Sequence, residues 1–203
     1  PLCRGVADRL AGAYAADRTR DPLGRWELPT ASFLAVRLDD AALEVAWLGD
    51  CTALLVRGDT VRRLGPAQDS HDAETALAAS LTQHGLGAPK RSAPILDELR
   101  ARRGRPGVHV LSVEPEMMEH LEAIHLPCAP GDELLLMTDG FAAPIDSYGL
   151  LDDAGLALLL ESEGLAGLAQ RLRAIENADS ACTRFPRFKT SDDATALWLR
   201  IAD

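Results

Sequence analysis

The residues in this sequence best suited to chemistry are carboxylates at the ends of apolar strands. The segment 134–140, Leu-Leu-Leu-Met-Thr-Asp-Gly, has the pattern of a buried strand that brings Asp139 to its end, where a glycine permits a sharp exit. The segment 192–199 is the reverse case, because Asp192 and Asp193 come directly before an apolar strand. Carboxylates that converge at strand ends suit hard cations such as Mg²⁺ or Mn²⁺. The pattern therefore predicts a site for divalent metal ions.

Each of these carboxylates also has a purely structural interpretation. An Asp-Gly pair after a strand is usually a turn, and acidic residues before a strand usually lie on a solvated edge. Under the metal interpretation, two ions held close together would ionise a bridging water near neutral pH and neutralise the oxygens of a phosphoryl group. Phosphate esters hydrolyse very slowly without such help. Metal-assisted hydrolysis of a phosphate ester is therefore the chemistry that this interpretation predicts.

Hydrophobic periodicity predicts the elements that must position these residues. Apolar residues recur first at helical spacing and then, after a polar connector, in short runs and alternations typical of an antiparallel meander. We expect strands at 32–38, 43–47, 53–56, from 61, 108–111, 132–137 and 194–201. We expect helices at 6–14, from 115 to 121, in two segments of 71–103, and around 156–160 and 165–175.

Composition limits the classes of protein to which the chain can belong. Its 203 residues, 47% hydrophobic and 26% charged, are typical of a globular protein, and we expect one domain over 1–203. A net charge of −10 argues against a nucleic-acid groove or a polybasic membrane surface, since both need local cations. We see neither a membrane-spanning run nor a signal peptide. Four scattered cysteines indicate reduced thiols, so we expect a cytoplasmic protein. The sequence does not determine the oligomeric state.

Four blocks of the sequence occur together in a particular order. They are 29–32 (Pro-Thr-Ala-Ser), 45–51 (Val-Ala-Trp-Leu-Gly-Asp-Cys), 132–141 (Asp-Glu-Leu-Leu-Leu-Met-Thr-Asp-Gly-Phe) and 191–195 (Ser-Asp-Asp-Ala-Thr). In that order they resemble the metal-dependent protein phosphatase 2C (PP2C, or PPM-type) family of Ser/Thr phosphatases, and its bacterial branch most closely. The resemblance covers roughly residues 29–201. It implies a layered α/β (α+β) fold in which an antiparallel β-sandwich is flanked by helices.

The resemblance also implies a reaction and a set of metal ligands. Asp139 and Asp192 resemble direct ligands of a centre of two Mn²⁺ or Mg²⁺ ions, and Asp50 resembles a residue near an additional metal position. A turn residue that closes a hairpin is the alternative interpretation of Asp50. The implied activity is hydrolysis of phosphoserine or phosphothreonine on a phosphoprotein substrate by a metal-activated water. It needs no covalent enzyme intermediate and no catalytic side chain beyond the metal ligands.

The sequence departs from the family's pattern at its front. The family's first strands carry an acidic ligand, an Asp-Gly motif whose aspartate bridges the ions, and often an arginine that grips phosphate, and none of these is present. The missing initiator Met favours a truncated N-terminus. The alternative is a catalytically inactive PP2C-like domain that serves in signalling or in partner binding. Farther along, Ala143 replaces another family aspartate and Asp146 lies off register, which argues against a third metal.

The segment 183–189 places cations shortly before Asp192. Arg184 and Arg187 are candidates to meet a substrate phosphate, because the planar guanidinium offers a bidentate fork. The alternative is a solubilising loop that balances an acidic protein, since exposed charge is ordinary.

Overall fold

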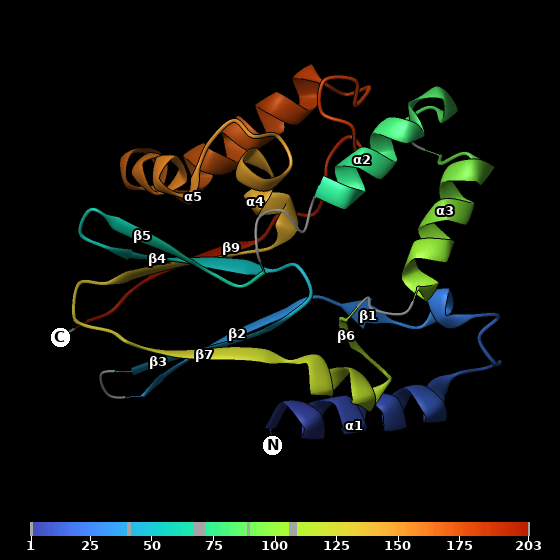
Figure 1. Cartoon of the computed structure of the whole chain (residues 1–203), viewed down its shortest axis with the longest axis horizontal. Coiled ribbons are helices and arrows are strands. Elements are labelled where there is room, and N and C mark those ends of the chain that lie inside the picture. The colour runs from blue at the N-terminus through green and yellow to red at the C-terminus, as the bar shows by residue number, and fades with distance from the viewer. Residues whose placement is uncertain (1, 40–41, 67–71, 89, 106–108, 203) are drawn as a thin grey trace.

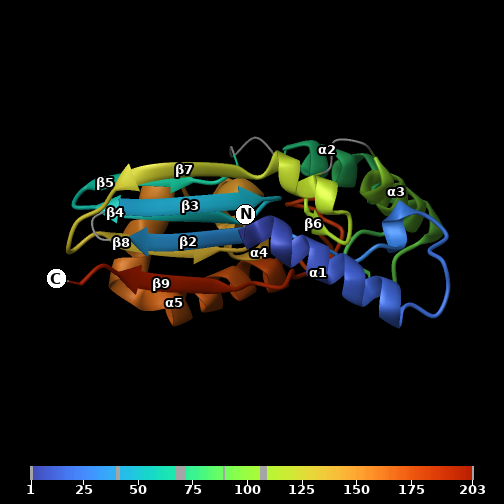
Figure 2. The ribbon, with the colours of Figure 1, turned by 90° about the horizontal axis from the view of Figure 1, so that it is seen from below.

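The computed structural model describes residues 2–39, 42–66, 72–88, 90–105 and 109–202. Two antiparallel β-sheets are stacked face to face, and two helices cover the outer side of one of them (Figures 1 and 2). Further helices gather at one end of the sandwich (Figure 1). This is the α+β architecture, with antiparallel sheets flanked by helices, that the sequence predicts. None of the described helices is both long enough and apolar enough to cross a membrane.

Within the described residues, one sheet consists of three antiparallel strands. In spatial order they are β2 (Phe33–Asp39), β3 (Ala42–Leu48) and β7 (Glu122–Pro127). The central strand alternates strictly, because Leu43, Val45 and Trp47 are buried while the residues between them are not. A strand with one face on a core and the other toward solvent has this period of two.

Among the residues that the structure describes, the second sheet consists of four antiparallel strands. In spatial order they are β5 (Thr60–Leu64), β4 (Thr52–Arg57), β8 (Glu133–Met137) and β9 (Ala196–Arg200). Both faces of this sheet are covered, so the two inner strands read as continuous apolar runs instead of alternating. β9 lies at an edge of the sheet and is mostly exposed.

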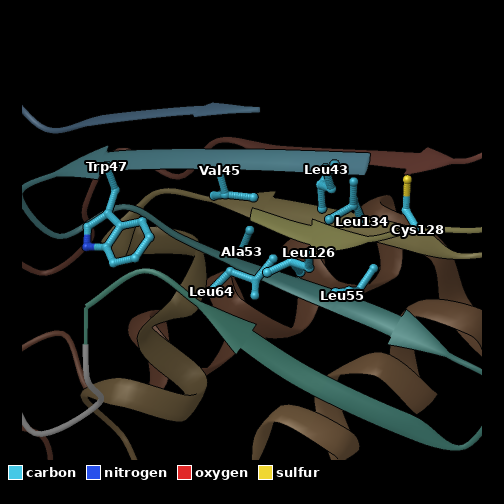
Figure 3. Close-up of a cluster of buried hydrophobic side chains, with 9 residues drawn as sticks. All are labelled: Leu43, Val45, Trp47, Ala53, Leu55, Leu64, Leu126, Cys128 and Leu134. Carbon is cyan, nitrogen blue, oxygen red and sulfur yellow. The ribbon is translucent and has the colours of Figure 1, made fainter. Parts of the chain in front are cut away.

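The main hydrophobic core lies between the two sheets, as Figure 3 shows. Leu43, Val45 and Trp47 of β3 face Leu55 of β4 and Leu134 of β8 across the sandwich. The other members of the cluster are Ala53, Leu64, Leu126 and Cys128. Burial of this apolar surface is the main force that holds the two sheets together.

A second core lies on the outer face of the four-stranded sheet. There α4 (Asp139–Asp146) and α5 (Asp153–Ala178) cover the strands (Figure 1). Leu54 and Leu135 of the sheet pack against Phe141 of α4 and Leu156 of α5. The strand that ends before Asp139 is therefore packed on both sides, which gives that end of the sheet a fixed position.

The remaining elements lie around one end of the sandwich. They are α1 (Leu2–Asp17), η1 (Arg25–Glu27), β1 (Thr30–Ala31), α2 (Asp72–Ser80), η3 (Thr82–His84), α3 (Ala93–Gly104), β6 (Leu111–Ser112) and η4 (Pro115–His120). The short strands β1 and β6 pair with each other. Ala78, Leu86 and Ile95 pack with Cys182 and Phe188, which fastens α2 and α3 to the segment 182–188.

Most of the predicted elements are confirmed, and β7 and α4 are the two larger elements that were missed, beside the short β1, η1 and η3. The strand β7 has only two apolar residues at alternating positions, Ile124 and Leu126, too short a pattern to separate from the helix predicted just before it. The helix α4 contains Gly140 and Pro144, which disfavour helix by propensity, so its start was interpreted as a turn. The predicted helix from 115 is a 3₁₀ helix. Of the strand predicted at 108–111, residue 108 lies outside the described residues, 109 and 110 are not in a strand, and only Leu111 belongs to β6.

Candidate functional site

Three acidic segments reach the same end of the four-stranded sheet. In the register of this sheet, Thr52 at the start of β4 lies beside Met137 at the end of β8. Met137 in turn lies beside Ala196 at the start of β9. Asp50 lies two residues before Thr52, Asp139 lies two residues after Met137, and Asp192 lies four residues before Ala196. The pairing of the strands therefore brings the three aspartates to one edge of the sheet.

This edge opens into a cavity of about 730 Å³. Asp50, Asp139, Asp192 and Asp193 all contribute to its lining, so the structure brings together the predicted carboxylates. The lining also includes residues of α3 and the residues before it, among them Arg91, Arg102 and Arg103. The cavity therefore has an acidic side from strand ends and a cationic side from a helix.

Close backbone packing holds Asp139 next to Asp192. A Cβ atom on residue 140 would lie 2.2 Å from the carbonyl oxygen of Asp193 and 3.1 Å from Cβ of Asp192. Only glycine lets the chain after Asp139 pass this close. The Thr195 backbone N–H donates to Oγ1 of Thr138 at 3.0 Å, and the Thr138 N–H donates to the Thr195 carbonyl at 3.0 Å. The two acidic segments are thus fixed against each other.

Asp50 lies in the connection between β3 and β4, where a serine holds it. The Ser32 hydroxyl donates a short hydrogen bond to Oδ1 of Asp50. Gly49 has a φ of +96°, and a Cβ atom there would lie 2.6 Å from Oγ of Ser32, so both the conformation and the space require glycine. This geometry is compatible both with the turn interpretation of Asp50 and with a carboxylate presented to the cavity.

Cys51 lies beside these carboxylates, and their negative charge affects the pKa of its thiol. Burial raises the pKa of the Cys51 thiol to about 11, and the negative charges of Asp50 and Asp139 add to the effect. The thiol is therefore protonated at neutral pH, and thiolate is the nucleophilic form of cysteine. Cys51 is suited to packing and not to attack on a substrate.

The carboxylates fit a divalent cation in kind but only partly in number. Asp192 forms an ion pair with Nζ of Lys189 and accepts a 2.7 Å hydrogen bond from the Asp193 backbone N–H. In the part of the chain that the structure describes, no three His, Cys, Asp or Glu side chains lie close enough together to hold a metal ion. Mg²⁺ often uses one or two carboxylates and completes its shell with water and substrate oxygens. Asp139 and Asp192 thus fit one hydrated ion better than a closed two-ion centre.

Arg187 lines the cavity, but its guanidinium is used inside the protein. Nη1 donates to Oδ2 of Asp179 at 2.7 Å and to the Phe185 carbonyl at 2.8 Å. Nη2 donates to the carbonyls of Asp179 at 2.8 Å and Glu176 at 3.3 Å, and Nε donates to that of Thr190 at 3.0 Å. These bonds engage all five of its N–H groups, which favours a structural role over capture of a phosphate.

Arg184 and Asp146 lie away from the cavity lining. The exposed guanidinium of Arg184 stacks 4.7 Å from the centre of the Phe185 ring. Asp146 is buried and pairs with Nη2 of Arg63 on β5 at 2.5 Å. The two phosphate-binding candidates in the segment 183–189 therefore remain predictions, and the geometry argues against both.

Sequence reasoning missed the cationic side of the cavity. Arg102 and Arg103 adjoin in the last turn of α3, and Arg91 lies just before this helix. A signal was present in the cluster of cations over 100–105, but basic residues in the last turn of a helix are ordinary because they complement its dipole. Only the packing of α3 against η1 and against Cys182 and Phe188 gives these residues a place in the cavity.

Comparison with protein-family models and with curated proteins found no match. Among solved structures, the chain is similar to PppA, described as a key regulatory component of T6SS in Pseudomonas aeruginosa (TM-score 0.53, 18% identity, 98% of this chain and 66% of that one). It is also similar to the serine/threonine phosphatase PstP/Ppp of Mycobacterium tuberculosis (TM-score 0.55, 16% identity, 98% and 69%). A third is the catalytic domain of PstP in complex with two manganese ions (TM-score 0.51, 16% identity, 98% and 68%).

The chain thus spans about two thirds of the length of these structures. At this level of identity the similarity shows a shared fold, that of PP2C-type phosphatases.

Proposed function

We propose that this chain acts as a PP2C-type phosphatase that removes phosphate from phosphoserine or phosphothreonine of a protein substrate, with a divalent cation. The observation that carries the proposal is the convergence of Asp50, Asp139 and Asp192 from three neighbouring strand ends on one cavity. The fold shared with serine/threonine phosphatases supports it.

Asp139 and Asp192 are the side chains that would hold Mn²⁺ or Mg²⁺. A bound cation lowers the pKa of a coordinated water and neutralises charge on phosphoryl oxygens. Lys189 would have to give up its ion pair with Asp192 when a cation binds. A centre of two ions, as the family resemblance implies, requires more oxygen ligands than these two carboxylates, and Asp50 is a further candidate on the cavity wall.

The state of Cys51 supports attack by water instead of by the protein. The pKa of this thiol, raised to about 11 by burial and by Asp50 and Asp139, leaves it protonated at neutral pH. The hydroxyl of Thr138, the residue before Asp139 in the chain, accepts a hydrogen bond from the Thr195 backbone N–H. Neither group is activated as a nucleophile by this geometry, which agrees with hydrolysis that has no covalent enzyme intermediate.

The proposal is tested by the variant Asp139→Asn, assayed for Mn²⁺-dependent hydrolysis of a phosphothreonine peptide. We expect turnover to fall by about 100-fold or more, because the amide keeps the shape of the side chain but loses the charge that attracts the cation. Asp193→Asn is the matched control, since Asp193 lines the same cavity but resembles a neighbour of the ligands. Turnover in Asp139→Asn equal to that of the unaltered protein would sink the assignment.

A non-catalytic binding domain of the same fold is the second candidate. It is favoured by the ion pair between Asp192 and Lys189, and by the lack of a group of three possible ligands among the residues that the structure describes. Such a domain would bind a phosphopeptide but show neither turnover nor Mn²⁺ binding in isothermal titration calorimetry. We further propose one domain over 1–203 and a cytoplasmic location, the latter supported by four free cysteines, two of them buried.

A further inference from the structure

We infer that Arg91 and Arg103, on the α3 side of the cavity, recognise acidic side chains that flank the phosphorylated residue of the substrate. The inference rests on the proposed function and adds a substrate class to it, an acidic phosphopeptide. It assigns the recognition of substrate charge to α3 instead of to Arg184 and Arg187.

The ion pairs of the cavity distinguish these two arginines from the other cations. Arg102 pairs with Glu74 at 2.8 Å, and Arg25 pairs with Glu114 at 2.8 Å. In contrast, Arg91 and Arg103 have no ion-pair partner within the described ranges. The contact of Arg103 there is a long hydrogen bond, 3.4 Å, to the neutral hydroxyl of Thr30. Two exposed positive charges on the cavity lining are therefore not balanced by described neighbours.

Arg103 stands on a firmly held helix, and Arg91 directly precedes the N-cap residue of that helix. Ile95 of α3 is only 1% exposed and packs in the cluster that includes Phe188 of the segment before Asp192. On the other side of the helix, the guanidinium of Arg100 lies 4.6 Å from the centre of the Trp26 ring. Because α3 is fixed at both places, less conformational entropy is lost when its side chains bind a ligand.

The contact between Arg103 and Thr30 places Arg103 near the carboxylates of the cavity. Figure 1 shows the C-terminal end of α3 beside β1, where Arg103 meets Thr30. Two residues after Thr30, the Ser32 hydroxyl bonds to Asp50. An extended peptide advances about 3.3 Å per residue, so a peptide held by its phosphate at the strand ends can bring its next few side chains to α3.

Electrostatics explains why such a cationic side is needed. The protein carries a net charge of −10, which repels an anionic substrate at long range. Unpaired cations at the cavity lower this barrier and favour partners of complementary charge. A nucleic acid fits less well, because its continuous phosphate backbone extends beyond the cavity and would be repelled by the net charge of −10 over a longer surface.

The test is a binding measurement that needs no turnover. A fluorescent peptide that carries a non-hydrolysable phosphonate analogue of phosphothreonine, with three glutamates on each side, is compared with one that has alanines there, by anisotropy in Mn²⁺. We expect the unaltered protein to prefer the acidic peptide by about fivefold to tenfold, as two surface ion pairs allow. The double variant Arg91→Ala/Arg103→Ala should reduce the preference to less than about twofold, and raising the salt should do the same.

The control is Arg184→Ala, which removes an exposed cation outside the cavity lining and should keep the preference. Circular dichroism of the double variant checks that it is folded, and Arg91→Lys/Arg103→Lys, which keeps both charges, should retain most of the preference. An unchanged preference in Arg91→Ala/Arg103→Ala overturns the inference, as does equal affinity for a single-stranded oligonucleotide of the same charge. A protein without Mn²⁺-dependent turnover that keeps the preference for the acidic peptide refutes the proposed function but supports this inference.

Discussion

Asp179 organises the segment that leads to Asp192. Its carboxylate accepts hydrogen bonds from the backbone N–H groups of Thr183, Arg184 and Phe185 at 2.9–3.0 Å, and from Nη1 of Arg187 at 2.7 Å. Burial alone would raise the pKa of Asp179, but these hydrogen bonds hold it well below its usual range. A carboxylate with so many donors stabilises its charged form. Arg187, the cation of this segment that pairs with Asp179, therefore stabilises the fold of the segment first.

The variant Asp179→Asn tests this role through the dependence of stability on pH. The folded pKa lies below the unfolded value of about 3.9, so the ionised carboxylate stabilises the fold at neutral pH and this stabilisation is lost in acid. We expect the free energy of unfolding to fall by about 3 kcal/mol at neutral pH, because Arg187 keeps a largely buried charge without its partner. The difference between the two proteins should shrink below a pH of about 4.

Urea denaturation at several pH values measures this difference. Arg184→Ala is the comparison, since it removes an exposed side chain and should change stability by no more than about 0.5 kcal/mol. A constant difference between Asp179→Asn and the unaltered protein from neutral to acidic pH would show that the charge of Asp179 does not stabilise the fold.

Among the elements, α5 depends on a break in its middle. Gly164 has φ of 69° and ψ of 178°, a conformation outside the helical region, so the element consists of two helical segments. Leu156 and Leu160 precede the break and Leu168 follows it, and all three pack into the core over the four-stranded sheet. The change of direction lets both segments cover the sheet, which agrees with the two helices that the periodicity predicts.

Gly164→Ala is expected to destabilise the protein by about 1–3 kcal/mol, because this backbone conformation is essentially restricted to glycine. The matched substitution is Gly12→Ala in α1, where a Cβ atom would meet nothing within 4 Å. There alanine should stabilise by about 0.5–1 kcal/mol, since it favours helix over glycine. Thermal unfolding of both variants measures these changes. If Gly164→Ala were as stable as Gly12→Ala, the conformation of Gly164 would not require glycine.

At the scale of the whole molecule, the four-stranded sheet belongs to two cores at once. On β4, Leu55 faces the other sheet while the adjacent Leu54 faces α4 and α5. On β8, Leu134 and Leu135 divide in the same way. Packing on both faces gives the strand ends that carry the site a rigid support, as precise positioning of functional groups requires.

Leu54→Ala and Leu55→Ala should therefore each lower the free energy of unfolding by about 2–5 kcal/mol, because each opens a cavity in a different core. Leu158→Ala is the control, since this α5 side chain is 66% exposed and its loss should cost no more than about 0.5 kcal/mol. A small effect of one β4 variant beside a large effect of the other would mean that only one core supports the sheet.

Local pattern was sufficient to predict most of the strands and helices, whereas their layered arrangement was implied by the resemblance to the PP2C family. Alternation in β3 and the unbroken apolar run of β8 are consequences of one-sided and two-sided burial, which is why they are visible in the residues themselves. The same patterns predicted that Asp139 ends a strand and that Asp192 precedes one. They failed for α4, where packing of Phe141 and Ile145 on the sheet overrides the poor helix propensity of its glycine and proline.

What the sequence by itself determined is thus the type of most elements and the chemical character of the strand ends. Only the tertiary structure decided which of these ends meet, because the alignment of Thr52, Met137 and Ala196 depends on strand pairing between distant segments. It also decided that Arg187 forms an ion pair with Asp179 while Arg103 lines the cavity. The sequence gives the type of each charged residue, but its ion-pair partner depends on which distant segments the fold brings together.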